Sequence, residues 1–464
     1  MKPSVVLLLV AIFFVSLLVF PTLGAQQSWS VISSHGMITG GSGKLGWLHT
    51  DGKYIKTASG QIVYLRGCAL IEPAYDVDRL NGPGTLATRA ERLKQLGVNF
   101  VRLEINIDNW NANTDTNGDG IGNRDFTTQA IQEFTSRGIY VCPGLHSGSF
   151  RNQFPYDTQA WINWLLNNIV IPFKDNPGVC GVYIFNEPGY GAWGGTNLGG
   201  GVTSGYWNAV KQVCQAIYAA NPNLLVVVHA DMANQDGFCP VLRTDPIPTP
   251  NVLYTWHYYY VYGPEFNPYL GWMSGVLDPS YQELVNRGHP YYQSYYYGNY
   301  TKARQEFEQY LYDRFMWVPT ELNLPIINDE YGWTGDEEPY FSYRACQKCL
   351  AANNGVPQSG VTFWKVGDTL DAPSGNPVGE GPYPDITYCP ICGEPLPRPR
   401  EHPEPGWLQA MHDFHQILNK YETHWSYYAW WPKTYGGYGL SIEGDMWSLS
   451  ETGEVWKDYL NAPT

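Results

Sequence analysis

The chain has 464 residues with 28 Lys and Arg against 43 Asp and Glu, which gives a formal net charge of −15. This balance excludes nucleic-acid binding, because neutralising phosphates requires a basic surface. Hydrophobic residues make up 44% of the chain and aromatic residues 15%, which excludes intrinsic disorder. The length allows one large α/β barrel with additions.

The first 25 residues have the composition of a secretory signal peptide. Lys2 is the only charged residue among them, and an apolar run over 5–20 leads into small residues that end at Ala25. The alternative is an uncleaved membrane anchor, although this run falls short of the about 20 residues that a span requires. We therefore expect a secreted protein, with no membrane segment after signal removal and an N-terminal extension over 26–46.

Short apolar runs then alternate with longer amphipathic ones. The apolar runs predict buried strands over 61–65, 98–105, 139–142, 179–185, 224–228, 252–256 and 325–328, with an eighth near 425–431. Helices are expected over 85–96, 127–137, 203–220 and 301–315. This alternation is typical of a parallel sheet, and eight strands indicate an α/β fold, the (β/α)8 TIM barrel. The barrel domain would cover 47–333 and 407–464.

Polar residues follow these strands where the active site of such a barrel lies. Glu187 and Glu330 end two different strands, and retaining glycoside hydrolysis uses two such carboxylates about 5 to 5.5 Å apart. Either glutamate alone could be a solvated carboxylate or half of a structural ion pair. The polar residues at the other strand ends favour a catalytic site; they are Arg102, His146, Asn186, His257 and Tyr259.

These residues lie in motifs that resemble glycoside hydrolase family 5 of clan A, a family of many cellulases and mannanases. The motifs are Asn99-Phe-Val-Arg-Leu103, Gly144-Leu-His146, Phe185-Asn-Glu-Pro188, Trp256-His-Tyr-Tyr259 and Asn328-Asp-Glu-Tyr-Gly332. The resemblance runs from about residue 47 to about residue 460. It implies a retaining mechanism with Glu187 as acid/base and Glu330 as nucleophile.

The supporting residues have chemically sensible roles within this mechanism. Asn186 would hydrogen-bond the 2-hydroxyl of the sugar. Arg102 and Tyr259 would orient the Glu330 carboxylate and favour its charged form. His257 beside the acid/base and His146 beside the sugar would position groups or balance charge, although either could be a core histidine.

Aromatic side chains in the loops after the strands are candidate sugar platforms, because indole and phenol rings stack on the flat faces of pyranoses. The candidates are Trp110, Trp193, Trp272 and Trp333, each of which could instead pack within its loop. The resemblance also implies an aromatic platform at the end of the eighth strand. Tyr428 and Trp430 are both candidates for that position.

An insertion of about 70 residues, over 334–406, separates the seventh and eighth strands. It contains the pairs Cys346/Cys349 and Cys389/Cys392, each with CxxC spacing. Two such pairs are typical of a zinc ribbon with four cysteine ligands, whereas an oxidising exterior would favour disulfides. We expect a structural zinc ion here, away from catalysis.

Asp115, Asn117 and Asp119 occupy alternate positions of a segment that resembles the start of a calcium loop. Phe126 takes the place of the twelfth-position glutamate, and an Asn/Asp/Gly turn is the alternative. Five further cysteines remain, and Cys180 with Cys214 is a candidate disulfide.

The leading hypothesis is a secreted endo-β-1,4-glucanase that acts on cellulose or related β-glucans and needs no cofactor for catalysis. An endo-β-mannanase or another β-glucanase is the alternative within the same class. A non-catalytic polysaccharide-binding barrel is the alternative of another class. Nothing in the sequence indicates the oligomeric state.

Overall fold

A computed structural model describes residues 45–70, 86–115, 120–188, 193–230, 237–260, 300–333, 405–430, 440–442 and 445–462. The predictions for the signal peptide, for the insertion and for Trp272 lie outside these residues. Within them, no helix has both the length and the apolar character needed to cross a membrane.

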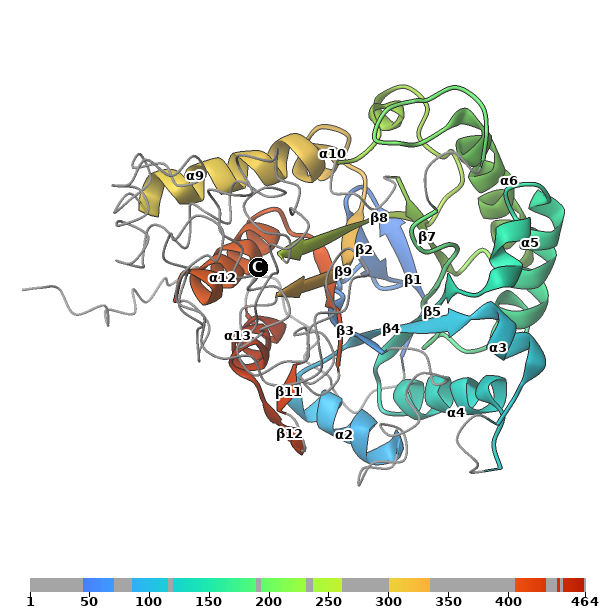
Figure 1. Ribbon diagram of the computed structural model, residues 1–464, viewed down its shortest axis with the longest axis horizontal. Helices are drawn as coiled ribbons and strands as arrows, with labels where there is room; N and C mark the ends of the chain where they lie inside the picture. Colours follow the sequence, from blue (N-terminus) through green and yellow to red (C-terminus); the bar gives the residue numbers. More distant parts are fainter. Residues whose placement is uncertain are drawn as a thin grey trace, which may run out of the picture. The chain divides into compact units, whose positions relative to one another are not determined.

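Eight parallel strands form a closed barrel in the order β10-β3-β4-β5-β6-β7-β8-β9 (Figure 1). This confirms the predicted (β/α)8 fold. The strands are β3 (Arg66–Leu70), β4 (Phe100–Asn106), β5 (Tyr140–Ser147), β6 (Gly181–Tyr183), β7 (Leu225–His229), β8 (Val252–Tyr260), β9 (Ile326–Trp333) and β10 (His424–Tyr427).

Helices follow the strands along the chain and surround the barrel (Figure 1). Their apolar faces pack on the outside of the barrel. Asp157 and Thr203 cap the N-termini of α5 and α6 by accepting backbone hydrogen bonds. The helices are α2 (Leu86–Leu96), α3 (Ile107–Ala112), α4 (Asn123–Ser136), α5 (Thr158–Leu165), α6 (Ser204–Ala220), α9 (Tyr300–Leu311), α10 (Trp317–Glu321), α12 (Pro405–Lys420) and α13 (Glu451–Leu460). A two-stranded sheet of β11 (Ser441–Ile442) and β12 (Asp445–Leu449) precedes α13.

The N-terminal end of the barrel is closed by a hairpin of β1 (Leu48–Asp51) and β2 (Tyr54–Thr57). Leu48 and Ile55 of the hairpin are buried. They pack with side chains near the beginning of four barrel strands, which are Phe100, Tyr140, Leu225 and Leu253. The predicted strand over 61–65 was wrong. That segment extends along the hairpin, where the Val63 amide donates to the Ile55 carbonyl, and the barrel strand begins at Arg66.

A glycine in β5 makes room for a large side chain inside the barrel. Gly144 pairs with Tyr183 of β6, and a Cβ atom on Gly144 would lie 2.4 Å from the Cβ atom of Tyr183. The fully buried Tyr183 ring therefore reaches the lumen, where it lies 4.5 Å from the guanidinium carbon of Arg102.

Candidate active site

Strand β4 supplies two charged side chains to the barrel lumen. Successive side chains of a strand alternate between its two faces, so Phe100, Arg102 and Glu104 share one face. Phe100 belongs to the lumen cluster, whereas Val101 and Leu103 pack against the helices. Sequence reasoning missed Glu104, although its spacing of two residues from Arg102 was sufficient to place it.

A β-bulge in β9 brings two consecutive acids into the lumen. Trp256 of β8 pairs with Asn328, but the next residue, His257, pairs with Glu330, so that Asp329 is the extra residue. The pairing of β9 with its other neighbour, β10, is also irregular here, because Trp425 pairs with Asn328 but Tyr427 pairs with Tyr331. Asp329 and Glu330 are 2% and 5% exposed. Sequence reasoning missed Asp329 because strict alternation would have turned it away from Glu330.

Arg102 is the cation at the centre of this acidic group. Its Nη1 atom lies 2.5 Å from Glu330 Oε2, its Nε atom 3.4 Å from Asp329 Oδ2 and its Nη2 atom 3.6 Å from Glu104 Oε1. Burial disfavours the charged guanidinium, but the surrounding carboxylates outweigh it and hold the pKa of Arg102 well above its usual value. The structure therefore places Arg102 on the Glu330 carboxylate, as the sequence predicted.

His257 of β8 connects the two sequence-predicted catalytic glutamates. Its Nδ1 atom lies 2.8 Å from Glu187 Oε1, and its Nε2 atom lies 3.4 Å from Glu330 Oε2. Burial lowers the tendency of the imidazole to be charged, but Glu330 and the hydrogen bonds to Asp329 and Glu187 outweigh it. The pKa of His257 is therefore raised well above its usual value. One carboxylate oxygen of Glu187 and one of Glu330 lie within 4.8 Å of each other.

Glu187 and Asn186 follow the short strand β6. Glu187 adopts a φ of 41°, a left-handed conformation that is uncommon outside glycine and that recurs at active sites. Its side chain is 41% exposed. The Asn186 amide oxygen accepts a hydrogen bond from Arg102 Nη2 at 2.6 Å, which leaves the Nδ2 group as the donor of this side chain. Arg151 donates to the carbonyl groups of His146 and Asn186 and so ties the ends of β5 and β6 together.

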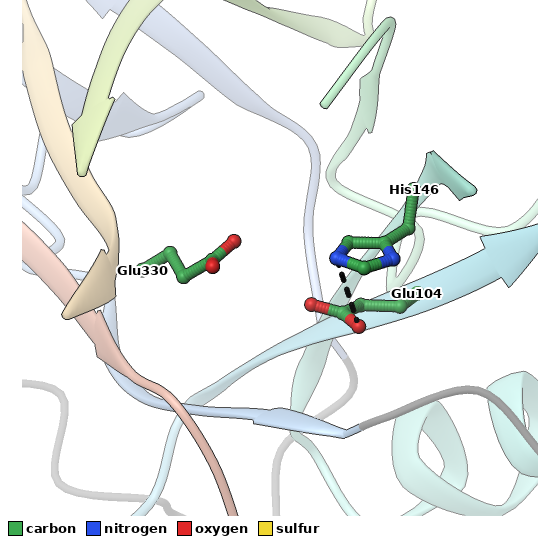
Figure 2. Close-up of side chains that lie close together, drawn as sticks. All are labelled: Glu104, His146 and Glu330. Carbon is green, nitrogen blue, oxygen red and sulfur yellow. Dashed lines mark ion pairs between the residues drawn. The ribbon is translucent and has the colours of Figure 1, made fainter. Parts of the chain in front are cut away.

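His146, near the C-terminal end of β5, lies beside Glu104, and Glu330 faces this pair from the opposite side (Figure 2). Its Nε2 atom is 3.5 Å from Glu104 Oε2, and its side chain is 25% exposed. Burial lowers the pKa of His146 to about 4, a shift that the Glu330 charge opposes and Arg102 reinforces. His146 is therefore neutral near pH 7 and can exchange hydrogen bonds with a ligand.

Within the described ranges, two groups have donor atoms close enough together to hold a metal ion: Glu104/His146/Glu330 and Glu187/His257/Glu330. Arg102 contacts the carboxylates of the first group, and a charged His257 lies within the second. An additional cation would be repelled by these charges. The donor set thus suits an acid–base pair better than a metal centre.

The structure corrects two of the predicted sugar platforms. Trp110 is 4% exposed, and its indole N–H donates to Asn168 Oδ1. Trp193 is 6% exposed and packs on Trp161 and Phe185. Both indoles are core residues, because helix packing behind the strands buries them, so the prediction that they stack on substrate was wrong.

Of the two candidates on the eighth strand, Tyr428 has the position expected of a platform. It is partly exposed at the end of β10. Burial raises the pKa of its phenol, and the nearby charges of Glu104 and Glu330 raise it further. Trp430 is 4% exposed and packs against Trp456 of α13, so it is a core residue.

Several predicted site residues cannot be compared with the structure. The backbones of Tyr259 and Trp333 pair in β8 and β9, but their side chains lie outside the described set. Asn117, Asp119 and the four cysteines of the insertion also lie outside it. Asp115 accepts a hydrogen bond from the Gly120 amide.

Cys180 and Cys214 are buried and free, so the proposed disulfide between them was wrong.

A (β/α)8 barrel with two glutamates, an arginine and two histidines gathered at the C-terminal ends of its strands has the architecture of a glycoside hydrolase. A family profile described as cellulase (glycosyl hydrolase family 5) matches residues 77–368, which is more than half of the chain. The protein therefore belongs to glycosyl hydrolase family 5, and it is an enzyme rather than a non-catalytic barrel.

Solved structures share this fold at low sequence identity. A β-glucanase from Saccharophagus degradans superimposes with a TM-score of 0.54 at 15% identity, over 93% of this chain and 98% of the other. An endocellulase from the archaeon Pyrococcus horikoshii gives 0.54 at 14% identity, over 90% and 100%. The Saccharophagus enzyme has also been solved in complex with cellotetraose. No curated protein sequence matches this chain significantly.

Proposed function

We propose that the protein is a secreted endoglucanase that hydrolyses internal β-1,4-glucosidic bonds with retention of configuration at the anomeric carbon. The observation that carries this proposal is the approach of a Glu187 oxygen to a Glu330 oxygen within 4.8 Å. Retaining glycosidases hold their carboxyl groups about 5 to 5.5 Å apart, whereas inverting enzymes leave about 6.5 to 9.5 Å for a water molecule. The close approach supports direct attack on the sugar.

In the first step, a Glu330 oxygen forms a bond to the anomeric carbon while the bond to the leaving oxygen breaks. Glu187 donates its proton to that oxygen. In the second step, Glu187 takes a proton from water, and the water oxygen displaces Glu330 from the anomeric carbon. Arg102 supports the first step because its positive charge favours the carboxylate form of Glu330.

Two further side chains suit the sugar in this site. The Asn186 Nδ2 group is the donor left for the 2-hydroxyl once Arg102 has taken the amide oxygen. Tyr428 offers a phenol ring beside Glu104 and Glu330 on which the pyranose bound there stacks. Neutral His146 is placed to hydrogen-bond a second hydroxyl of the same sugar.

The choice of a β-glucan rests on family membership and on the β-glucanase and endocellulase named among the structural neighbours. Secretion rests on the signal-like composition of residues 1–25. Reducing-sugar assays on cellulose, barley glucan, mannan and xylan test the substrate. Activity confined to mannan would overturn the glucanase proposal in favour of an endo-mannanase. Mass spectrometry of the exported protein tests cleavage after residue 24 or 25.

The mechanism is tested with Glu330→Ala, Glu187→Ala and the surface control Glu91→Ala, on cellotetraose. We expect the first two to lose at least about 10⁴-fold in kcat, in line with the loss of a catalytic unit, and the control to match the wild type. Proton NMR of the first product formed should show the β anomer. An initial α anomer, or full activity in Glu330→Ala, contradicts the mechanism.

We also propose, from sequence alone, that residues 334–406 bind one structural zinc ion through Cys346, Cys349, Cys389 and Cys392. Elemental analysis of the purified protein should find about one zinc per chain. Absence of zinc together with disulfide-linked peptides would support the alternative. The same elemental analysis measures the calcium expected at Asp115, Asn117 and Asp119.

A further inference from the structure

The proposed reaction gives no role to two acids of the active-site cluster, Glu104 and Asp329, and Asp329 is the one of the two that faces His257. Its side chain is 3% exposed, and it reaches the lumen only because it is the extra residue of the β9 bulge. It accepts a hydrogen bond from the Thr255 hydroxyl. Its Oδ2 atom faces Arg102 Nε at 3.4 Å, and its Oδ1 atom faces His257 Nε2 at 3.3 Å.

His257 has acceptors at both ring nitrogens. Glu187 faces Nδ1, and Asp329 and Glu330 of β9 both face Nε2. The Tyr183 hydroxyl lies 3.3 Å from Nε2, and the His229 ring of β7 lies 4.5 Å away between centroids. A neutral imidazole has only one N–H group, so it cannot donate to acceptors on both sides. When Glu187 is ionised, the arrangement therefore requires the imidazolium form.

The charges around His257 change during the proposed reaction. Glu187 is neutral while it holds the acidic proton, and Glu330 loses its charge while it is bound to the sugar as an ester. Each glutamate therefore loses its charge at one stage of the reaction, and at that stage it no longer stabilises the imidazolium. Burial would raise the pKa of Asp329, but Arg102 and His257 hold it below its usual value, so that Asp329 remains charged throughout.

We propose that Asp329 is a positioning residue, the permanent counter-ion that keeps His257 doubly protonated through both steps, so that the Nδ1–H group holds the Glu187 carboxyl in place. This inference rests on the proposed retaining function, because the loss of charge on Glu330 occurs only in a covalent intermediate. Asp329 acts through His257, because its carboxylate oxygens already face Arg102, Thr255 and His257.

The direct test is nitrogen NMR of ¹⁵N-histidine-labelled full-length enzyme at pH 8, with the His257 signals assigned from the spectrum of His257→Asn. We expect imidazolium shifts for wild-type His257 both in the free enzyme and after trapping of Glu330 with a 2-deoxy-2-fluoro-β-cellobioside. In Asp329→Asn, the trapped enzyme should show a larger fraction of neutral ring than the trapped wild type, because Glu187 is then the one charged carboxylate that still faces His257. Glu104→Gln is the matched control, since it removes a buried charge from the other side of Arg102, and it should keep the imidazolium.

Kinetics supply the second readout. On cellotetraose, Asp329→Asn should move the alkaline limb of the kcat/KM profile to lower pH by about 1 to 3 units, the size of shift that a neighbouring charge produces. A 2,4-dinitrophenyl cellobioside, whose leaving group needs no acid, should show a smaller loss of kcat. An equal loss on both substrates points to a structural defect and overturns the proposal.

A neutral His257 in the wild-type enzyme at pH 8 also overturns it, and this measurement stands even if Asp329→Asn does not fold. If the fluoro-sugar fails to label Glu330, the retaining function fails instead. The free-enzyme spectrum then still reports whether Asp329 sets the charge of His257.

Discussion

Arg102 and Glu104 lie two residues apart on β4, and both side chains point into the barrel lumen, where Nη2 of the arginine is 3.6 Å from Oε1 of the glutamate. Asp329 and Glu330 contact the same guanidinium from β9. One buried cation therefore pairs with carboxylates from two strands of the barrel. The catalytic centre and the stability of the barrel depend on the same side chain.

Replacing Arg102 by Met should strongly destabilise the protein, because carboxylates remain buried without their cation. We expect a loss of about 3 to 5 kcal/mol in the free energy of unfolding, measured by denaturant titration. The exposed Arg124→Met is the control and should change it by less than about 0.5 kcal/mol. Adding Glu104→Gln to Arg102→Met should restore part of the loss. A double variant less stable than the single one would contradict this account.

Gly144→Ala should destabilise the barrel by at least about 1 to 3 kcal/mol, the usual cost of overpacking. The new methyl group would overlap the Cβ atom of Tyr183. The backbone fixes the position of this Cβ atom, so a change of rotamer cannot move it away. Thermal unfolding measures the effect. Gly46→Ala is the matched control, since nothing lies within 4 Å of the added atom. Equal melting temperatures for the two variants would show that β5 and β6 accommodate the methyl group without loss of stability, contrary to this prediction.

Tyr428 should act through its ring rather than through its hydroxyl. Tyr428→Phe keeps the stacking face and should retain kcat/KM on cellotetraose within a few-fold. Tyr428→Ala should lose about 10- to 100-fold, which corresponds to about 1.4 to 2.8 kcal/mol. Steady-state kinetics distinguish these outcomes. A Phe variant as impaired as the Ala variant would assign the function to the phenol hydroxyl near Glu104 and Glu330.

Stability should fall in mild acid because of His424. Burial lowers the pKa of this side chain to about 3, and its Nδ1 atom accepts a hydrogen bond from the Leu65 amide. The unfolded chain takes up a proton near pH 6.5, whereas the folded protein does so only near pH 3. The free energy of unfolding therefore decreases as the pH falls through this window, by up to about 1.4 kcal/mol per pH unit.

His424→Asn keeps an acceptor for Leu65 and removes the titrating group. Urea unfolding between pH 7 and pH 4 should then show a shallower decrease of stability than the wild type shows. The slope contributed by His146, whose pKa is also lowered, remains in both proteins. An unchanged slope in the variant would mean that His424 does not titrate differently on unfolding.

The barrel and the polar residues at its strand ends could be predicted from sequence because each depends on a local pattern. Continuous apolar runs indicate strands buried on both faces, and the residues that follow them meet at one end of the barrel. Arg102, Asn186, Glu187, His257 and Glu330 were found in this way. Glu104 could have been found by the same alternation that places Arg102.

Other features depend on contacts between distant segments. The bulge at Asp329 exists only relative to the neighbouring strands, and no local pattern in the sequence encodes it. The burial of Trp110 and Trp193 is set by helices packed behind the strands. The segment 61–65 is as apolar as a barrel strand, but pairing with the hairpin decides its place.

The hairpin that closes the barrel also has a consequence for the order in which the protein can fold. The Thr50 amide donates to Asn251, and the Tyr54 hydroxyl donates to Glu422, 368 residues further along the chain. The hairpin is thus anchored by a residue that is synthesised 368 positions later. The ribosome must release nearly the whole barrel before the hairpin can close its N-terminal end. Contacts between residues so far apart in sequence make folding slow.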